Sequence, residues 1–509
     1  ENYANPTCQD NCFSRLASTF NGSAVPNALS TPYNQFIVSG QHSAYPNTQT
    51  VVWEPRVGIA WRPFHNDKTV IRSGAGVFSD TLPGGLAEDA AFNAPSLNSF
   101  TIPNGLIAPG VAGSLFNTAA AANQALISQF KSGGSFNSIS QSVPGFAAPS
   151  FFSFPSTFKQ PTYYKWNFEI EESLGAKMLL TMNYSGMHGI HIPVADYGMN
   201  AYCPPTVCTD GFVGLPTAPP NPAFGTVAQY LSAGDANYNG LTISLQRRLS
   251  AGLTFTLNYT WSHALDDVSN GGVQNEPFGI FQTDQDITTP QNPFNIRGNY
   301  GNADYDVRHY VSANFVLTDM FRHAGFKYGP NPVFGGWTLS SNLFLRSGTP
   351  FTLEDLSATG ILAGYNYGSN PGIGIFASPV GYVPGSCTSA VNSPCLSTSQ
   401  FLPSAAVTGF PTGFGTAARN SIYGPHFFDM DIALMKDIRI KEHFTFSFGA
   451  QAYNALNHPN FDNPVSDISN PLFGKSIAEV APPTSLLGAF VSGTAASPRF
   501  VEIKGVIRF

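Results

Sequence analysis

The sequence predicts an all-β fold: a transmembrane antiparallel β-barrel of the outer-membrane type, with long extracellular loops. Segments of about ten residues alternate apolar and polar side chains eleven times, which is the pattern of barrel strands. No stretch reaches the roughly 18 uninterrupted apolar residues of a transmembrane helix. Because only helices and closed barrels satisfy every backbone group in lipid, a membrane protein with this pattern must span with strands.

The composition also fits a membrane barrel better than a soluble domain. Charged residues make up only 11% of the chain, against about a quarter in soluble domains, while Phe (42), Gly (49) and Pro (40) are abundant. The net charge of −7 argues against nucleic acid as a partner. The chain opens at Glu1 without the features of a signal peptide, so we expect a mature form or a fragment.

Each predicted strand rests on period-two alternation. The clearest case is 253–262, where Phe255 and Leu257 share one face and Thr254 and Thr256 the other. The eleven strands are predicted at 51–62, 68–80, 163–174, 176–186, 239–249, 253–262, 305–317, 336–346, 427–436, 443–453 and 500–509. The last strand ends on Phe509, as outer-membrane barrels commonly do, so we expect the barrel assembly machinery to recognise this residue.

The connections alternate between short and long. Short connections are expected at 63–67, 175, 250–252, 318–335 and 437–442, and long ones at 81–162, 187–238, 263–304, 347–426 and 454–499. In outer-membrane barrels the short turns are periplasmic and the long loops extracellular. The last strand therefore runs from outside to periplasm. The only plausible helix is the Ala-rich run 118–130, inside a loop.

The odd number of strands poses a problem, because an all-antiparallel barrel needs an even number. One solution is a further strand in 1–50, where 31–39 is a weak candidate. The solution that we favour is that the N-terminal part of a larger barrel is missing. Residues 1–50 are then an extracellular loop segment, and 51–509 the C-terminal portion of a barrel.

Tryptophan and cysteine positions support the same topology. The five tryptophans lie near strand ends on the apolar faces, as interfacial girdles require: Trp53, Trp61, Trp166, Trp261 and Trp337. The alternative is that they are core tryptophans of a soluble β-protein. The cysteines form three close pairs in extracellular segments: Cys8 and Cys12, Cys203 and Cys208, Cys387 and Cys395. We expect disulfides rather than zinc sites, since no pair has CxxC spacing.

Charged residues on the polar strand faces are expected to form cross-strand pairs along a wet lumen, or to contact a plug or solute. They are Glu54, Arg56, Glu169, Glu171, Arg248, Arg308, Asp429, Asp431, Glu502 and Lys504. Four acids flank the loop 263–304 and either bind calcium or cap turns and pair with Arg297 or Arg308: Asp266, Asp267, Asp304 and Asp306.

No catalytic, cofactor or metal site is assigned from the sequence, and an enzyme is not expected. GxSxG, GxxxxGK[ST] and HExxH motifs are all missing. His188 and His191 supply at most half of a metal site. We expect His188, His263 and His458 to be polar residues at the extracellular rim, not a shared site.

Several motifs resemble the Oar-like TonB-dependent receptors of Acidobacteria. They are EPRVGIAWRPF at 54–64, DKTVIR at 67–72, NYNGLTISLQRR at 237–248, NYTWSHALDD at 258–267, DYDVRH at 304–309, GGW at 335–337, RSGTPF at 346–351 and YNALNHPNF at 453–461. This resemblance implies a 22-stranded barrel, an N-terminal plug and a preceding carboxypeptidase-regulatory-like β-sandwich. It also implies that the TonB–ExbB–ExbD complex acts through the N-terminal region, which is missing here.

Three functions follow. The first is an outer-membrane TonB-dependent receptor, embedded in outer-membrane lipid, that takes up a large solute such as an oligosaccharide. The second is a passive pore or surface adhesion barrel. The third is a soluble secreted β-protein. The sequence does not identify the solute.

Overall fold

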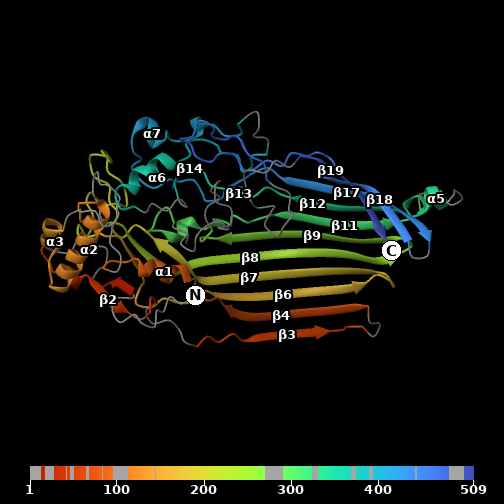
Figure 1. Ribbon diagram of the computed structural model, residues 1–509, viewed down its shortest axis with the longest axis horizontal. Helices are drawn as coiled ribbons and strands as arrows, with labels where there is room; N and C mark the ends of the chain where they lie inside the picture. Colours follow the sequence, from red (N-terminus) through yellow and green to blue (C-terminus); the bar gives the residue numbers. More distant parts are fainter. Residues whose placement is uncertain are drawn as a thin grey trace.

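One large antiparallel sheet dominates the computed structural model (Figure 1). The structure describes residues 13–17, 28–41, 43–45, 51–64, 68–82, 84–95, 113–143, 145–269, 290–323, 331–367, 374–388, 394–441, 444–480 and 498–509. Hydrogen bonds join the main strands in the order β19–β18–β17–β12–β11–β9–β8–β7–β6–β4–β3. Two short strands, β10 (Gly301–Asn302) and β5 (Phe151–Ser153), pair with β9 and β8 and bring the sheet to 13 strands.

Every segment with predicted alternation contains a strand of this sheet. In chain order the strands are β3 (Arg56–Trp61), β4 (Thr69–Ser79), β6 (Thr162–Ser173), β7 (Met178–Asp196), β8 (Val227–Ser250), β9 (Leu253–Asp266), β11 (His309–Thr318), β12 (Trp337–Arg346), β17 (Phe427–Lys441), β18 (Phe444–Tyr453) and β19 (Phe500–Arg508). Among these eleven main strands, each one pairs with the next main strand in the chain, so the sheet is a meander.

Strands β7 and β8 extend about ten residues beyond their prediction. A bulge interrupts their pairing between Gly189 and Ile192, after which the ladder resumes as far as Asp196 opposite Gln229. The bulge shifts the alternation by a residue, which hid the extension from the sequence pattern. The 24 residues of β8 span roughly 80 Å at about 3.3 Å each, so the strand exceeds the apolar core of a membrane, about 30 Å thick.

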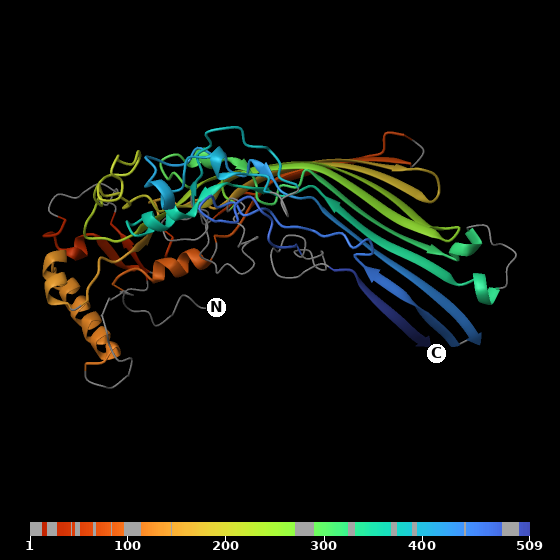
Figure 2. The same ribbon diagram turned by 90° about the horizontal axis from the view of Figure 1, so that it is seen from above.

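The two edge strands are not joined. No hydrogen-bonded pairing connects β3 with β19 within the described ranges. Because the path between them contains an odd number of antiparallel strands, both run in the same direction. Figure 2 shows the sheet as a curved wall rather than a flat layer.

The alternative of a further barrel strand at 31–39, which we did not favour, does not agree with the structure. This segment holds a short 3-10 helix, Tyr33–Gln35, and then β2 (Ile37–Gln41). Strand β2 pairs with β1 (Phe13–Leu16) in a separate two-stranded sheet. The reason is local: Tyr33, Phe36 and Ile37 are all buried, so the segment packs into a small core instead of exposing one face to lipid.

Long connections gather at one end of the sheet and short connections, with the C-terminus, at the other (Figure 1). The predicted helix at 118–130 is confirmed as α2 (Leu115–Lys131), whose N-terminus is capped by Ser114. Further helices were not predicted because they are too short to show a helical period: α1 (Gly84–Ala91), α3 (Phe136–Ser142), α4 (Met320–His323), α5 (Asn331–Phe334), α6 (Leu356–Ala363) and α7 (Ala405–Thr408). No helix in the described part of the chain is long and apolar enough to cross a membrane.

Burial is inverted relative to a soluble β-protein. The buried apolar clusters lie mainly at the loop end, with Phe130 and Phe224 in one and Phe351 and Ile422 in another. The sheet instead exposes large apolar side chains on strands from β3 to β19. They are Val57, Ile59, Trp61, Trp166, Phe168, Tyr184, Leu257, Trp261, Leu345, Phe448, Ile503 and Ile507. A soluble protein rarely exposes so wide an apolar surface, so this face is suited to lipid.

Four of the five tryptophans lie in the sheet as expected for girdles. Trp61, Trp166 and Trp261 are exposed, and Trp337 begins β12 beside the short connection 319–336. The strand prediction was wrong for Trp53, which precedes β3 and is 84% exposed.

Candidate functional site: the inner wall and the loops

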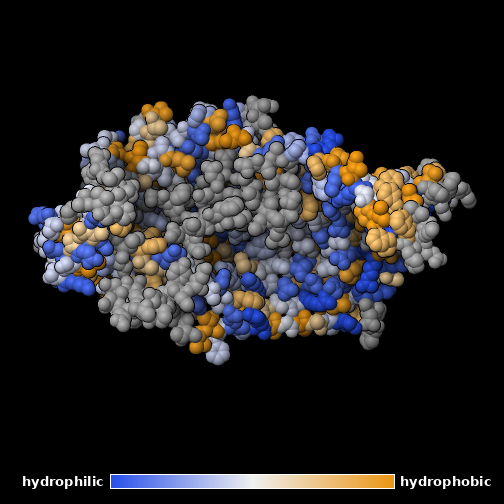
Figure 3. Space-filling view, in the orientation of Figure 1, coloured by the Kyte–Doolittle hydropathy of each residue, from blue (hydrophilic) through white to orange (hydrophobic). Residues whose placement is uncertain are grey.

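The face opposite the exposed apolar side chains carries mainly polar residues. Strand register places Arg72 beside Glu169, Glu169 beside Asn183, Asn183 beside Thr242 and Thr242 beside Thr260. Since side chains alternate between faces along each strand, these five lie in one row on one face. Figure 3 shows predominantly hydrophilic residues over β4, β6 and β7. This surface is the inner wall.

Hydrogen bonds and ion pairs connect side chains along this wall. The Arg72 guanidinium Nη1 lies 2.9 Å from Glu169 Oε1 and 2.5 Å from Glu171 Oε1. Asn183 Nδ2 donates to Glu169 Oε2 (2.9 Å), and the hydroxyls of Thr242 and Thr260 are 2.9 Å apart. The expected cross-strand pairing is therefore confirmed for both glutamates, with Arg72 as the partner that the sequence did not single out.

Other charged residues of the wall differ from the expected cross-strand pattern. Glu54 pairs with Arg56 (2.8 Å) and Glu502 with Lys504 (3.3 Å), so each pair lies along its own chain segment. Arg248 follows a break in the β8–β9 register and is exposed, which removes it from the row. Within the described residues, Asp429 and Asp431 form no ion pair.

A buried arginine holds two long loops together. The Arg419 side chain is 1% exposed, and its Nη2 forms an ion pair with Asp266. Its Nε donates to the Asn299 carbonyl and its Nη1 to the Ser269 carbonyl, both at 2.7 Å. Its nearest partner in sequence is Asp304, more than a hundred residues away, so no local pattern could have identified Arg419.

The acids proposed as calcium ligands are occupied by protein donors. Asp306 pairs with Arg308 (3.0 Å) and accepts from the Tyr423 hydroxyl (2.6 Å), which confirms the arginine alternative for this acid. The expected Arg297 pairs with Asp235 instead. The remaining acids accept from the following donors: Asp266 from Arg419, Asp267 from the Asp235 backbone N–H, and Asp304 from Asn420. The described residues contain no group of three or more His, Cys, Asp or Glu side chains placed to hold a metal ion.

The three rim histidines have separate surroundings. His188 bonds to Asn237 (2.9 Å) and lies flat against Tyr164. His263 bonds to Asn302 and Arg308, both through Nε2. His458 instead lies beside a second imidazole, that of His426, which the sequence did not single out.

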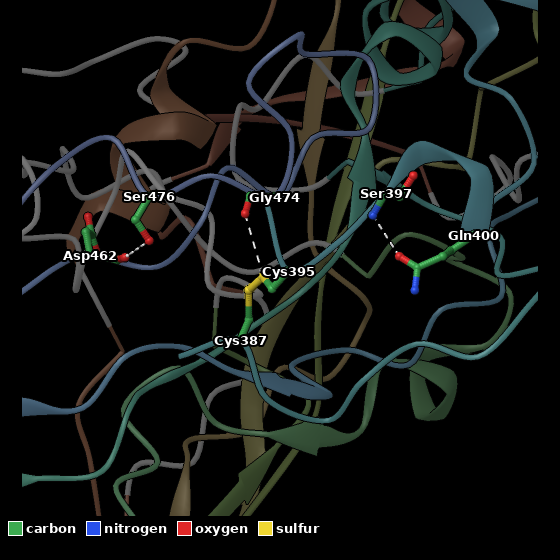
Figure 4. Close-up of a disulfide and its surroundings, with 7 residues drawn as sticks. All are labelled: Cys387, Cys395, Ser397, Gln400, Asp462, Gly474 and Ser476. Carbon is green, nitrogen blue, oxygen red and sulfur yellow. Dashed lines mark hydrogen bonds between the residues drawn. A yellow bond between two sulfur atoms is a disulfide. The ribbon is translucent and has the colours of Figure 1, made fainter. Parts of the chain in front are cut away.

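Two of the three expected disulfides are present. Cys203 is bonded to Cys208 and Cys387 to Cys395, both in long connections. In Figure 4 the Cys395 sulfur points toward the Gly474 carbonyl at 3.6 Å, so the bridge also contacts the last long loop. The pair Cys8 and Cys12 lies outside the described residues.

A buried carboxyl lies where three loop segments meet. Glu354 in β14 (Glu354–Asp355) pairs with β15 (Ile375–Phe376), and its backbone bonds to Ser466 and Ile468. Burial raises the pKa of the Glu354 carboxyl to about 8, and the nearby charges of Asp467 and Asp304 add to the rise. Glu354 is therefore a neutral acid at moderate pH.

This pKa predicts a pH dependence of loop stability. Between about pH 4.5 and pH 8 the folded loops keep a proton on Glu354 that the unfolded chain releases, so stability falls as the pH rises through this window. We expect Glu354→Gln to flatten the dependence in thermal melts followed by tyrosine fluorescence. The control Asp210→Asn removes an exposed loop acid and should leave the slope unchanged. Equal slopes for wild type and Glu354→Gln would contradict the assignment.

One family model matches this chain, and several solved structures are similar to it. The model of the outer membrane beta barrel domain matches residues 2–483. No curated protein matches the chain. Among solved structures it is similar to the outer membrane transporter YddB from Escherichia coli, with 9% identity and a TM-score of 0.40 over 89% of this chain and 40% of the other. It is similar to the siderophore receptor PiuA from Acinetobacter baumannii, with 8% identity and a TM-score of 0.36 over 89% and 35%.

The chain thus spans about 40% of the first of these structures. The family model, by contrast, covers nearly all of the present sequence and includes every main strand from β3 to β18. This protein belongs to the outer membrane beta barrel domain family and is located in the outer membrane.

Proposed function

We propose that this chain is the C-terminal portion of a TonB-dependent receptor barrel that imports a solute too large for diffusion pores. The two-faced sheet carries the proposal: a wall of bonded polar side chains on one face, and exposed apolar side chains on the other. Such a wall encloses a wet lumen when the sheet closes. The motifs that resemble Oar-like receptors favour an energised receptor over a plain pore.

The domain organisation that we propose places residues 1–50 in an extracellular loop segment and 51–509 in the C-terminal part of a 22-stranded barrel. Strands β3 and β19 run in the same direction, so antiparallel closure requires an odd number of strands between them. Eleven further strands meet this condition. We assign the plug, the carboxypeptidase-regulatory-like domain and the contact with TonB–ExbB–ExbD to the remaining part of the receptor.

At the other end of the barrel we propose that Phe509 is the residue that the assembly machinery recognises. Its side chain is fully exposed, and it ends the edge strand β19. An exposed strand edge offers unpaired backbone groups to another protein.

We propose an oligosaccharide as the first solute to test. Aromatic side chains are exposed on the long loops, with Tyr382 at 83% and Phe294 at 61% exposure. Rings of this kind present an apolar body with a flat face, and a tyrosine adds a polar tip. Exposed rings of this kind on the long loops are what supports the choice of an oligosaccharide.

The proposal predicts that uptake depends on TonB. In cells that carry the complete receptor, deletion of TonB should abolish accumulation of a fluorescent oligosaccharide, because a plugged barrel opens only when energy is supplied. The measurement is cell-associated fluorescence after washing, with a diffusion pore as the control. Uptake that persists without TonB would support the passive pore, and surface binding without uptake would support an adhesion barrel.

A further inference from the structure

Two imidazoles lie side by side at the loop end of β17. His426 directly precedes β17, and His458 follows β18. Their ring centroids are 5.6 Å apart and their planes are inclined by 44°. This arrangement differs from those of His188 and His309, each of which lies nearly parallel to a tyrosine ring, at 19° and 12°.

A neighbouring amide defines which nitrogen of His458 carries the proton. The Phe428 backbone N–H donates to Asn460 Oδ1 at 2.8 Å, which identifies that atom as the amide oxygen. The same oxygen lies 3.2 Å from His458 Nδ1, so Nδ1 is the protonated nitrogen of the neutral ring. The Nε2 lone pair is then available. Histidines that bind metals usually donate their other N–H to an oxygen in this way.

The backbone around His458 is held in place before any ligand binds. The Asn454 side chain accepts from the His458 N–H and donates to the His458 carbonyl, both at 2.9 Å. The Asn454 N–H in turn donates to Asp431 Oδ1 (3.1 Å). Asn454 and Asn457 adopt positive φ, which asparagine tolerates better than most residues. This turn fixes the direction in which the imidazole leaves the chain.

His426 is presented from a similarly constrained segment. It lies between Pro425 and Phe427, which is 3% exposed, while His426 itself is exposed. Phe428 contacts the His458 ring (5.5 Å between centroids) and shares the strand face of His426. The Arg346 guanidinium lies over Phe427, on the opposite face of β17, so this cation does not share the face of the imidazole pair.

We propose that His426 and His458 form a two-imidazole site for a divalent transition-metal ion such as Zn²⁺, Cu²⁺ or Ni²⁺. Imidazole nitrogen suits these ions, whereas calcium and magnesium prefer oxygen. Two imidazoles on one tetrahedral ion, with metal–nitrogen bonds of about 2.0–2.1 Å, have ring centroids about 5 Å apart. The observed centroid separation of 5.6 Å is close to this value. The other coordination positions remain open to water.

The test uses Cu²⁺ as the probe and the whole chain in detergent micelles without an affinity tag. We expect one Cu²⁺ per chain by titration calorimetry and an electron paramagnetic resonance spectrum with two coordinated nitrogens. His426→Phe and His458→Phe keep an aromatic ring while removing the ligand. Each substitution should weaken Cu²⁺ binding by about tenfold or more. Loss of a residue that only hydrogen-bonds to a metal ligand already weakens metal binding by about this factor, so loss of the ligand itself should have at least this effect.

His188→Phe is the matched control, because His188 is also near the extracellular rim but lies against Tyr164. It should bind Cu²⁺ as the wild type does. All variants should keep the gel mobility of the folded wild type before heating. Wild-type protein that binds no Cu²⁺, or a His426→Phe/His458→Phe double variant that binds like wild type, would overturn the proposal and leave an aromatic cluster.

Discussion

Replacement of Arg419 by alanine is expected to break the buried contacts between two long loops and to destabilise these loops by about 3–5 kcal/mol. The substitution removes the one ion-pair partner that Asp266 has within the described residues and leaves this buried carboxylate uncompensated. It also leaves the carbonyls of Asn299 and Ser269 without their donor. The measurement is hydrogen exchange of the segments 290–304 and 411–423, together with thermal unfolding.

The matched control for this prediction is Arg297→Ala. Arg297 also forms an ion pair, with Asp235 at 2.9 Å, but its side chain is 81% exposed, so water replaces the contact. An exposed pair of this kind contributes about 0–1 kcal/mol. If the two variants lose the same stability, the buried network around Arg419 does not hold the loops.

An arginine on the apolar face should be far more damaging than one on the polar face. Leu257 lies in the middle of β9, is 40% exposed and has Leu245 and Ala313 as strand neighbours. In lipid, Leu257→Arg is expected to lower the free energy of unfolding by about 2–4 kcal/mol, the cost of an arginine near the bilayer midplane. The measurement is a denaturant titration in lipid vesicles.

Thr256→Arg is the control on the opposite face of the same strand. Thr256 pairs with Gln246 and Asn314, so its side chain joins the polar row of the inner wall. An arginine there stays in water and should change stability by less than the Leu257 variant. A larger loss for Thr256→Arg would mean that the two faces are assigned the wrong way round.

The strands were predictable because each one carries its own pattern. In 253–262 the alternation alone placed Phe255 and Leu257 on the lipid-type face, and β9 contains this segment. The helix at 118–130 was likewise readable from its composition and became α2. Prediction failed where the pattern was interrupted, as at the bulge after Gly189. The weak candidate at 31–39 joined a loop core and not the main sheet.

The candidate site was predictable only in part. Glu169 and Glu171 were placed on the inner wall from the strand pattern, but their partner Arg72 required the register between β4 and β6. Arg419 and His426 gave no signal at all. Their partners lie far away in sequence or in irregular segments, and a contact of this kind depends on how the loops fold over one another.

By itself, the sequence determined the class of this protein: a two-faced antiparallel sheet with long connections at one end. It could do so because successive side chains of a strand point to opposite faces of the sheet. A strand between water and lipid must therefore alternate polar and apolar residues. Only the tertiary structure showed that the edge strands β3 and β19 do not pair and that Asp266 forms an ion pair with Arg419. It also showed that the rings of His458 and His426 lie side by side. These outcomes depend on distances between segments that no local period encodes.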